Sequence, residues 1–209
     1  MSTAHTRTPP TASFVTPEEY FAIEAEADAR GGPKHEYING RIREMVGGSP
    51  SHGRVERNLW RILGNAVEGT SFEYFGSDTR VRINTIGDYY YPDATIAPYP
   101  AKFHHSYGYA LINPIVVFEV LSPSTESFDR NKKLKNYAGI DSVRDYVLVA
   151  QDRVEIDHFW RETGDDWHWA NLQDASATLS LKGVDISLSV AKLYDRVSFE
   201  AVDRAGDSE

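Results

Sequence analysis

Apolar residues recur with helical spacing in two parts of the N-terminal third. The first begins at Thr16-Pro-Glu-Glu19, where a capping residue and a proline are followed by acids that suit the positive end of a helix dipole. We expect this helix to end near Ala29, before Gly31-Gly-Pro33. A second helix is predicted after Ser51 and ends at Gly69. Its apolar stripe consists of Val55, Leu59, Ile62, Leu63, Ala66 and Val67.

Strand patterns fill most of the remaining chain. Two short runs flank Asn39-Gly40, the preferred two-residue turn of a hairpin. A loop with His104, His105 and Tyr107 precedes the central part of the chain. The last third indicates an antiparallel meander and a short helix over residues 190–194. The predicted strands are 35–38 and 41–45 in the hairpin, 72–75, 79–84 and 89–97 before the loop, and 153–160, 167–171 and 178–188 in the meander.

The most apolar run spans residues 114–121 and predicts a strand that is buried on both faces and central in its sheet. A loop over residues 122–125, a helix over 128–138 and a second apolar strand over 144–149 follow it. A strand, a helix and a strand in this order form a crossover unit, so we expect the two strands to be parallel. The fold class is α/β, with a mixed β-sheet flanked by helices and with an N-terminal helix and hairpin.

The length of 209 residues suits one domain with a single core. We expect a disordered tail over residues 1–13, one domain over 14–195 and an acidic C-terminal tail over 196–209. No stretch approaches the roughly 20 apolar residues that a membrane span needs, and the first residues contain no apolar signal core. These features predict a cytoplasmic protein without a membrane partner.

The chain has no cysteine and a formal net charge of -9. A metal must therefore be held by carboxylates, carbonyls or histidines, and carboxylates favour Mg²⁺ or Mn²⁺. The acidic balance is a poor match to a protein that coats nucleic acid, which relies on excess lysine and arginine. It does not exclude a nuclease, whose basic residues can be local.

Glu119 is the unusual residue, because a carboxylate within an apolar strand costs several kcal/mol to bury without a partner. Asp93 interrupts another strand-like run, 26 residues earlier. Two acids on neighbouring strands are what a divalent cation site requires. Each acid also has a structural interpretation, since a strand glutamate can bond to backbone amides or an arginine, and Pro-Asp is common in turns. The pair and the basic helix after it favour the metal site.

That basic helix carries Lys132, Lys133 and Lys135 just after the Glu119 strand. A lysine near the site would stabilise negative charge at a scissile phosphate. The alternative is a solvated helix surface, which is the usual position of a lysine cluster. Asp129 at the start of the helix has the residue type of a cap or a first-turn acid.

The motifs in order resemble the Uma-type family of restriction endonucleases, within the PD-(D/E)XK nuclease superfamily. The likeness runs from about Thr16 to Leu193, and the order and spacing of the motifs together are more specific than any one of them. The motifs are Tyr37-Ile-Asn-Gly40, Ser49-Pro-Ser-His52, Pro92-Asp93, Val117-Phe-Glu-Val-Leu-Ser-Pro-Ser-Thr125, Asp129-Arg130 with Lys133, and Tyr137-Ala138.

The resemblance implies a restriction-endonuclease-like fold and Mg²⁺- or Mn²⁺-dependent hydrolysis of phosphodiester bonds in DNA. Asp93 and Glu119 match the acids that bind the metal, and Val120 would offer its backbone carbonyl to the same ion. Glu36 and His52 match positions that we expect at the edge of the site. For His52 alone, a helix-end or surface position is the commoner interpretation.

The chain departs from the superfamily at one important position. The usual motif has a lysine two residues after Glu119, on the same face of the strand, and here that residue is Leu121. The resemblance implies that Lys133 on the following helix is the substitute. A helix lysine can reach the same point in space from a different backbone position.

Two further functions stay open at the level of sequence. A catalytically inactive nuclease fold could serve as a nucleic-acid-binding or regulatory module, and two carboxylates could act as acid and base in a sugar or nucleotide hydrolase. The stretch Leu121-Ser-Pro-Ser124 lacks the G-x-S-x-G frame of a nucleophile elbow. The prediction of a homodimer rests only on the nuclease hypothesis, because two symmetric sites suit the cutting of both strands of a duplex.

Overall fold

The structure is a computed structural model that describes residues 14–45, 47–83, 85–106 and 108–199. The expected tail over residues 1–13 and the last ten residues of the expected acidic tail lie outside these ranges, as do Asn84 and Tyr107. In the parts of the chain that are described, no helix is both long enough and apolar enough to cross a membrane.

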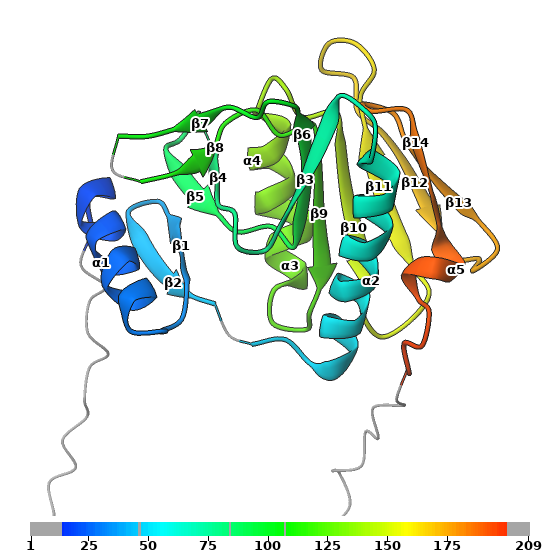
Figure 1. Cartoon of the computed structure of the whole chain (residues 1–209), viewed down its shortest axis with the longest axis horizontal. Coiled ribbons are helices and arrows are strands. Elements are labelled where there is room, and N and C mark those ends of the chain that lie inside the picture. Colours follow the sequence, from blue (N-terminus) through cyan, green and yellow to red (C-terminus); the bar gives the residue numbers. More distant parts are fainter. Residues whose placement is uncertain (1–13, 46, 84, 107, 200–209) are drawn as a thin grey trace, which may run out of the picture.

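A six-stranded mixed sheet forms the centre of the molecule, in the order β12-β11-β10-β9-β6-β3 (Figure 1). The predicted crossover is confirmed, since β9 and β10 are parallel and lie in the middle of the sheet. All other neighbours in this sheet are antiparallel. The strands are β3 (Phe72–Gly76), β6 (Ala94–Pro98), β9 (Val116–Leu121), β10 (Asp145–Ala150), β11 (Ile156–Trp160) and β12 (His168–Leu172).

A second, smaller sheet has the order β2-β1-β5-β4-β8-β7. Its first hairpin turns at Asn39 and Gly40 as predicted, and both residues have positive φ, as this turn type requires. The strands are β1 (His35–Ile38), β2 (Arg41–Glu44), β4 (Val81–Ile83), β5 (Asp88–Tyr90), β7 (Phe103–His104) and β8 (Ala110–Leu111). A separate hairpin of β13 (Thr178–Leu181) and β14 (Ile186–Ser189) forms a third sheet.

Two long helices begin at side-chain caps. In α1 (Pro17–Ala29) Thr16 and Glu19 form a reciprocal capping box, and in α2 (Pro50–Val67) the Ser49 hydroxyl accepts the first-turn bond from the His52 amide. The segment after β9 is helical from residue 126 to 138. It consists of α3 (Glu126–Phe128), the π-helical turn η1 (Asp129–Lys133) and α4 (Leu134–Ala138). A short helix, α5 (Val190–Leu193), follows the last strand.

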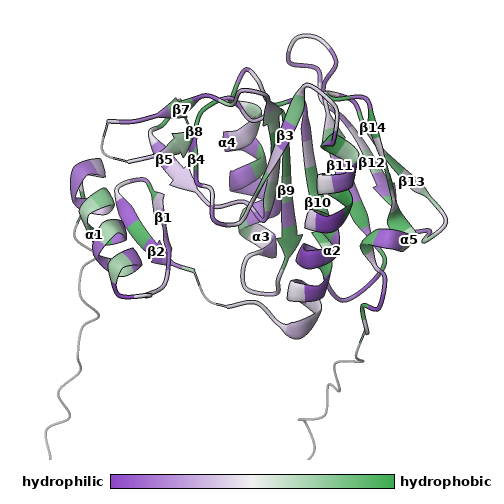
Figure 2. Ribbon diagram, in the orientation of Figure 1, coloured by the Kyte–Doolittle hydropathy of each residue, from purple (hydrophilic) through white to green (hydrophobic). Residues whose placement is uncertain are grey.

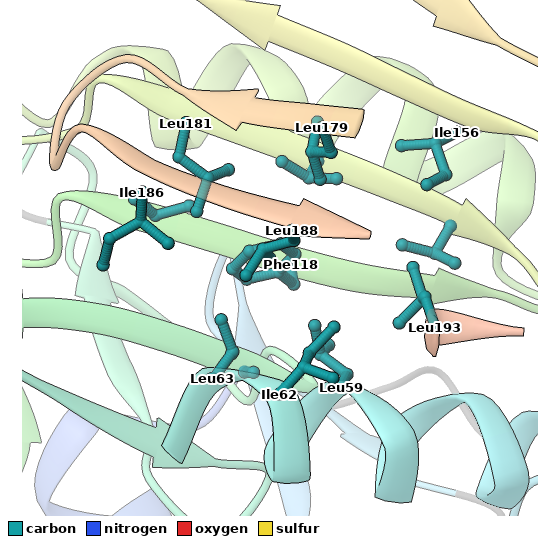
Figure 3. Close-up of a cluster of buried hydrophobic side chains, with 14 of the residues drawn as sticks. Leu59, Ile62, Leu63, Phe118, Ile156, Leu179, Leu181, Ile186, Leu188 and Leu193 are labelled. Carbon is teal, nitrogen blue, oxygen red and sulfur yellow. The ribbon is translucent and has the colours of Figure 1, made fainter. Parts of the chain in front are cut away.

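The main core fills the space between α2, the β13–β14 hairpin and one face of the central sheet. The apolar stripe of α2 faces this space as predicted, and Leu59, Ile62 and Leu63 point towards Phe118 and Leu188 (Figure 3). The visible side of α2 is largely hydrophilic in Figure 2. Burying each leucine contributes about 1.5–3 kcal/mol of hydrophobic free energy.

A second core lies on the opposite face of the central sheet, beneath α4 and the smaller sheet. Side chains alternate along β9, so that Phe118 and Val120 enter the first core while Val117 and Leu121 enter the second. Glu119 therefore points to the side of the sheet that the helical segment after β9 covers.

Four details differ from the sequence predictions. The single strand over residues 89–97 is two strands in different sheets, because Pro92 has no amide hydrogen for a ladder. The expected loop around His104 contains the short strands β7 and β8. The third helix starts two residues earlier than expected and contains a π turn. The run over residues 178–188 is a hairpin outside the meander of β10, β11 and β12.

Candidate active site

A cleft of about 290 Å³ opens between the end of β9, the start of α2 and the helical segment after β9. All six residues singled out from the sequence line it. The set is Glu36, His52, Asp93, Glu119, Val120 and Lys133. The fold thus brings together residues that are up to 97 positions apart, from Glu36 to Lys133.

Asp93 and Glu119 lie close together because of the register between β6 and β9. The ladder pairs Ala94 with Phe118, so one step further places Asp93 opposite Glu119 on the same face of the sheet. The Val120 amide donates a hydrogen bond to Oδ2 of Asp93 at 2.5 Å. Glu119 lies within β9 as expected, whereas Asp93 lies just before β6 rather than on a strand.

The backbone of Val120 has the orientation that a carbonyl ligand needs. The N–H and C=O of one residue point to the same side of a strand, and the Val120 amide points to Asp93. Pairing between β6 and β9 ends at Ala94. Pro92, the next possible partner on that side, has no amide to donate.

Lys133 lies at the centre of a buried cluster of acids. Its Nζ is 3.0 Å from Oε1 of Glu119, 2.9 Å from Oε1 of Glu36 and 3.4 Å from Oδ1 of Asp129. All four residues are no more than 5% exposed. The helix lysine thus lies beside Glu119, while Lys135 on the same helix is exposed to solvent.

Burial and charge shift the pKa values of this cluster. Burial raises the pKa of Glu119 well above its usual range, although Lys133 acts to lower it. Burial alone would lower the pKa of Lys133, but the carboxylates of Glu119, Glu36 and Asp129 outweigh burial and raise it well above its ordinary value. Burial also raises the pKa of Asp129 against the opposing effect of Lys133. Lys133 is therefore a fixed positive charge at neutral pH.

His52 connects α2 to Asp93. Its Nε2 is 3.3 Å from Oδ1 of Asp93, and Trp60 on the same helix donates its indole N–H to the Asp93 backbone carbonyl at 2.8 Å. Burial lowers the pKa of His52, but its hydrogen bond and charge interaction with Asp93 leave the pKa raised overall. His52 lies at the helix end, as its commoner interpretation predicts, and also lines the cleft.

The donors in the cleft fit a divalent cation. Glu36, Glu119 and Asp129 surround Lys133, and Asp93 is a fourth buried acid of the same cleft. This excess of acids favours a bound cation. Within the described ranges, however, no three Asp, Glu or His side chains already form a metal cluster. An ion would be held by Asp93, Glu119 and the Val120 carbonyl.

Sequence reasoning missed two residues of the site. Asp129 is a first-turn acid, as one of its two sequence interpretations predicts, and it is also buried beside Lys133 at the first position of the π turn. Tyr137 donates a hydrogen bond to Oε1 of Glu119 at 3.3 Å. The i, i+4 spacing of Asp129 and Lys133 predicts that both lie on one face of a helix, but it does not predict that this face is buried.

Comparison with known proteins identifies the family. Residues 17–191 match the Uma2 family, described as "Putative restriction endonuclease". The chain belongs to the Uma2 family. An uncharacterized protein of Synechocystis sp. is 36% identical over 194 residues, which cover 91% of this chain and 97% of that protein. A second uncharacterized protein of the same organism is 30% identical over 176 residues, which cover 84% and 97% of the two chains.

The fold of this Uma2 protein is similar to a crystal structure from Anabaena variabilis, titled as a putative nuclease belonging to DUF820. The TM-score is 0.63 at 16% identity, and the match covers 78% of this chain and 90% of that chain. At this identity the likeness shows the fold alone, which is restriction-endonuclease-like as the sequence predicted. Membership of the Uma2 family supports a nuclease function, and divalent metals are typical of restriction-endonuclease-like families.

Proposed function

We propose that the chain is a Mg²⁺- or Mn²⁺-dependent endonuclease that hydrolyses phosphodiester bonds of DNA. The observation that carries this proposal is the position of Asp93 opposite Glu119, with the Lys133 ammonium 3.0 Å from the Glu119 carboxylate. Two acids and a lysine at one point are the parts that a metal-dependent phosphodiesterase needs.

Asp93, Glu119 and the Val120 carbonyl hold the ion in this proposal. A bound divalent ion would polarise the phosphate and lower the pKa of an attacking water. The Val120 amide and His52 each bond to one oxygen of Asp93, so they fix the orientation of that carboxylate. Partners of this kind keep a ligand in one geometry.

Lys133 stabilises negative charge rather than accepting a proton. The three carboxylates around it raise its pKa and keep it protonated, so it cannot serve as a general base near neutral pH. Its ammonium is instead a preorganised charge for the transition state at phosphorus. Glu36 and Asp129 hold the ammonium beside Glu119.

The mouth of the cleft has groups that suit a phosphate backbone. Arg43 lines it, with its guanidinium 5.3 Å from the centre of the Phe128 ring, and Ser122 and Ser124 contribute hydroxyls. Arginine and serine are common contacts to phosphate oxygens. Two symmetric sites of a homodimer would suit cleavage of both strands of a duplex, and sedimentation of the protein with and without DNA tests for this dimer.

Incubation of the protein with plasmid, linear and single-stranded DNA in Mn²⁺ tests the proposal. We expect cleavage that EDTA abolishes and that Asp93→Asn or Lys133→Met slows by about 100-fold or more. Asp141→Asn, which changes an exposed acid away from the cleft, is the matched control and should cleave at the wild-type rate. If the wild type binds metal and DNA but cuts none of these substrates, the chain is instead an inactive nuclease-fold binding module.

A further inference from the structure

A row of arginines runs along the outer side of α2. Arg54, Arg57 and Arg61 are spaced i, i+3 and i+7, which places all three on one face of the helix. The apolar stripe of α2 packs into the main core on another side, and the visible outer side is hydrophilic in Figure 2. Arg57 and Arg61 are exposed to solvent and Arg54 is partly exposed. The row is therefore accessible to a partner.

The chain after α5 lies beside this row and adds another cation. Asn58 on α2 donates a hydrogen bond from Nδ2 to the carbonyl of Asp195 at 2.8 Å, and the Ser51 hydroxyl donates to the carbonyl of Ser198 at 3.0 Å. Arg196 lies between these two contacts in the sequence and is exposed. We call Arg54, Arg57, Arg61 and Arg196 the arginine face.

Acids do not neutralise the arginine face. Nη2 of Arg61 is 3.8 Å from Oδ2 of Asp195, and both side chains are about half exposed, so this ion pair is weak. Arg54, Arg57 and Arg196 form no side-chain hydrogen bond or ion pair with any residue that the structure describes. Their guanidinium groups are thus available to an anion from outside the chain.

The positions of these charges are unfavourable for the helix alone. Arg57 has a like charge three residues before it and another four residues after it, and such pairs repel one another. A helix surface that only faces solvent usually alternates the two signs of charge. Glu56, the one acid in the α2 sequence, lies four residues after His52 and therefore on the side of that residue. An anionic partner would relieve the repulsion within the row.

The place of the arginine face in the fold indicates the kind of anion. Ser49 and His52 at the start of α2 line the cleft, and Arg54 lies about 3 Å beyond His52 along the helix axis at 1.5 Å per residue. Arg54 and Arg61 are about 10 Å apart on this axis, which corresponds to about three nucleotides of one strand. Guanidinium groups bind phosphate oxygens through paired hydrogen bonds. A strand with one phosphate in the cleft can therefore continue along the arginine face.

We propose that the arginine face binds the phosphate backbone of the DNA strand that passes through the cleft. The choice of DNA rests on the proposed nuclease function. In a chain with a net charge of -9, this local group of cations gives a polyanion an attractive surface. The contacts are made to phosphates, so binding is independent of base sequence and weakens as salt rises.

Binding measured in EDTA tests the arginine face without requiring cleavage. Fluorescence anisotropy gives the affinity for a short labelled duplex over a series of KCl concentrations. Each contact to a phosphate contributes about 0.9 to the slope of log affinity against log salt. We expect the double variant Arg54→Gln/Arg57→Gln to lower the size of this slope by about two and to weaken binding by about tenfold or more at about 0.1 M salt.

A second double variant, Lys102→Gln/Lys135→Gln, is the matched control. It removes the same net charge from two exposed lysines that lie outside α2 and do not line the cleft. We expect this variant to keep the wild-type slope. Both double variants should unfold at the wild-type midpoint, because none of the four side chains is buried.

Equal slopes for the wild type and the arginine variant would overturn the proposal, as would the absence of binding by the wild type at the lowest salt. Equal losses in the arginine and lysine variants would also overturn it, since they would reflect net charge alone. If the wild type binds DNA through the arginines but does not cut it in Mn²⁺, the arginine face stands and the nuclease proposal fails. If both proteins bind and cut DNA equally, the nuclease proposal stands and the arginine face is wrong.

Discussion

Replacement of Lys133 by methionine is a sharp test of the buried charge cluster. Methionine keeps most of the length of the side chain but removes the ammonium that lies within 3.4 Å of three carboxylates. Glu36, Glu119 and Asp129 would then be buried acids without a counter-charge. Removal of one partner from a buried ion pair costs about 3–5 kcal/mol, because the remaining charge is left uncompensated. We expect a loss of this size in the free energy of unfolding at pH 7.

Urea unfolding in EDTA measures this loss. The loss should shrink at acidic pH, because the pKa values of Glu119 and Asp129 are already raised by burial and these acids will take up protons once the lysine is gone. Lys135→Met is the control, since Lys135 is exposed on the same helix and should change stability by less than about 0.5 kcal/mol. If the two variants lose equal stability at pH 7, Lys133 does not compensate a buried acidic cluster.

Three other variants test separate parts of the structure. Burial raises the pKa of Glu119, so this residue stabilises the folded protein below its unfolded pKa, and the stabilisation is lost as pH rises through its folded pKa. Glu119→Gln should therefore flatten this part of the curve of unfolding free energy against pH. An unchanged curve would contradict the raised pKa. Leu63→Ala in the core beneath α2 should cost about 2–5 kcal/mol in urea unfolding, and a loss under 1 kcal/mol would mean that the helix is not packed as described. Tyr137→Phe removes the hydroxyl that bonds to Glu119 and should cost about 0.5–1.5 kcal/mol in the same assay, so a stabilised variant would exclude that bond.

Local signals in the sequence predict much of the fold. Three such signals each depend on only a few neighbouring residues, so the local structure that they form can be predicted from the sequence. They are the capping residues of α1, the Asn39-Gly40 turn and the apolar run of β9. The parallel pairing of β9 and β10 follows from the crossover between them. The division of residues 89–97 between two sheets depends on tertiary pairing, and Pro92 was its only local sign.

The candidate site was partly visible in the sequence for a similar reason. Glu119 stands out because an acid is rare in an apolar strand, and the register of β6 then brings Asp93 opposite to it. The resemblance to the family pointed to Lys133. Asp129 could not be distinguished from an ordinary helix-start acid, because its burial depends on how the π turn packs against β9 and β10.

Isothermal titration of Mg²⁺ and Mn²⁺ into the wild type and Glu119→Gln tests the central claim most directly. The claim is that Asp93 and Glu119 hold one divalent ion between β6 and β9. We predict one site in the wild type, an affinity that rises with pH because Glu119 must lose its proton, and a loss of binding of tenfold or more in Glu119→Gln. Equal binding to both proteins, or binding to neither, would contradict the account.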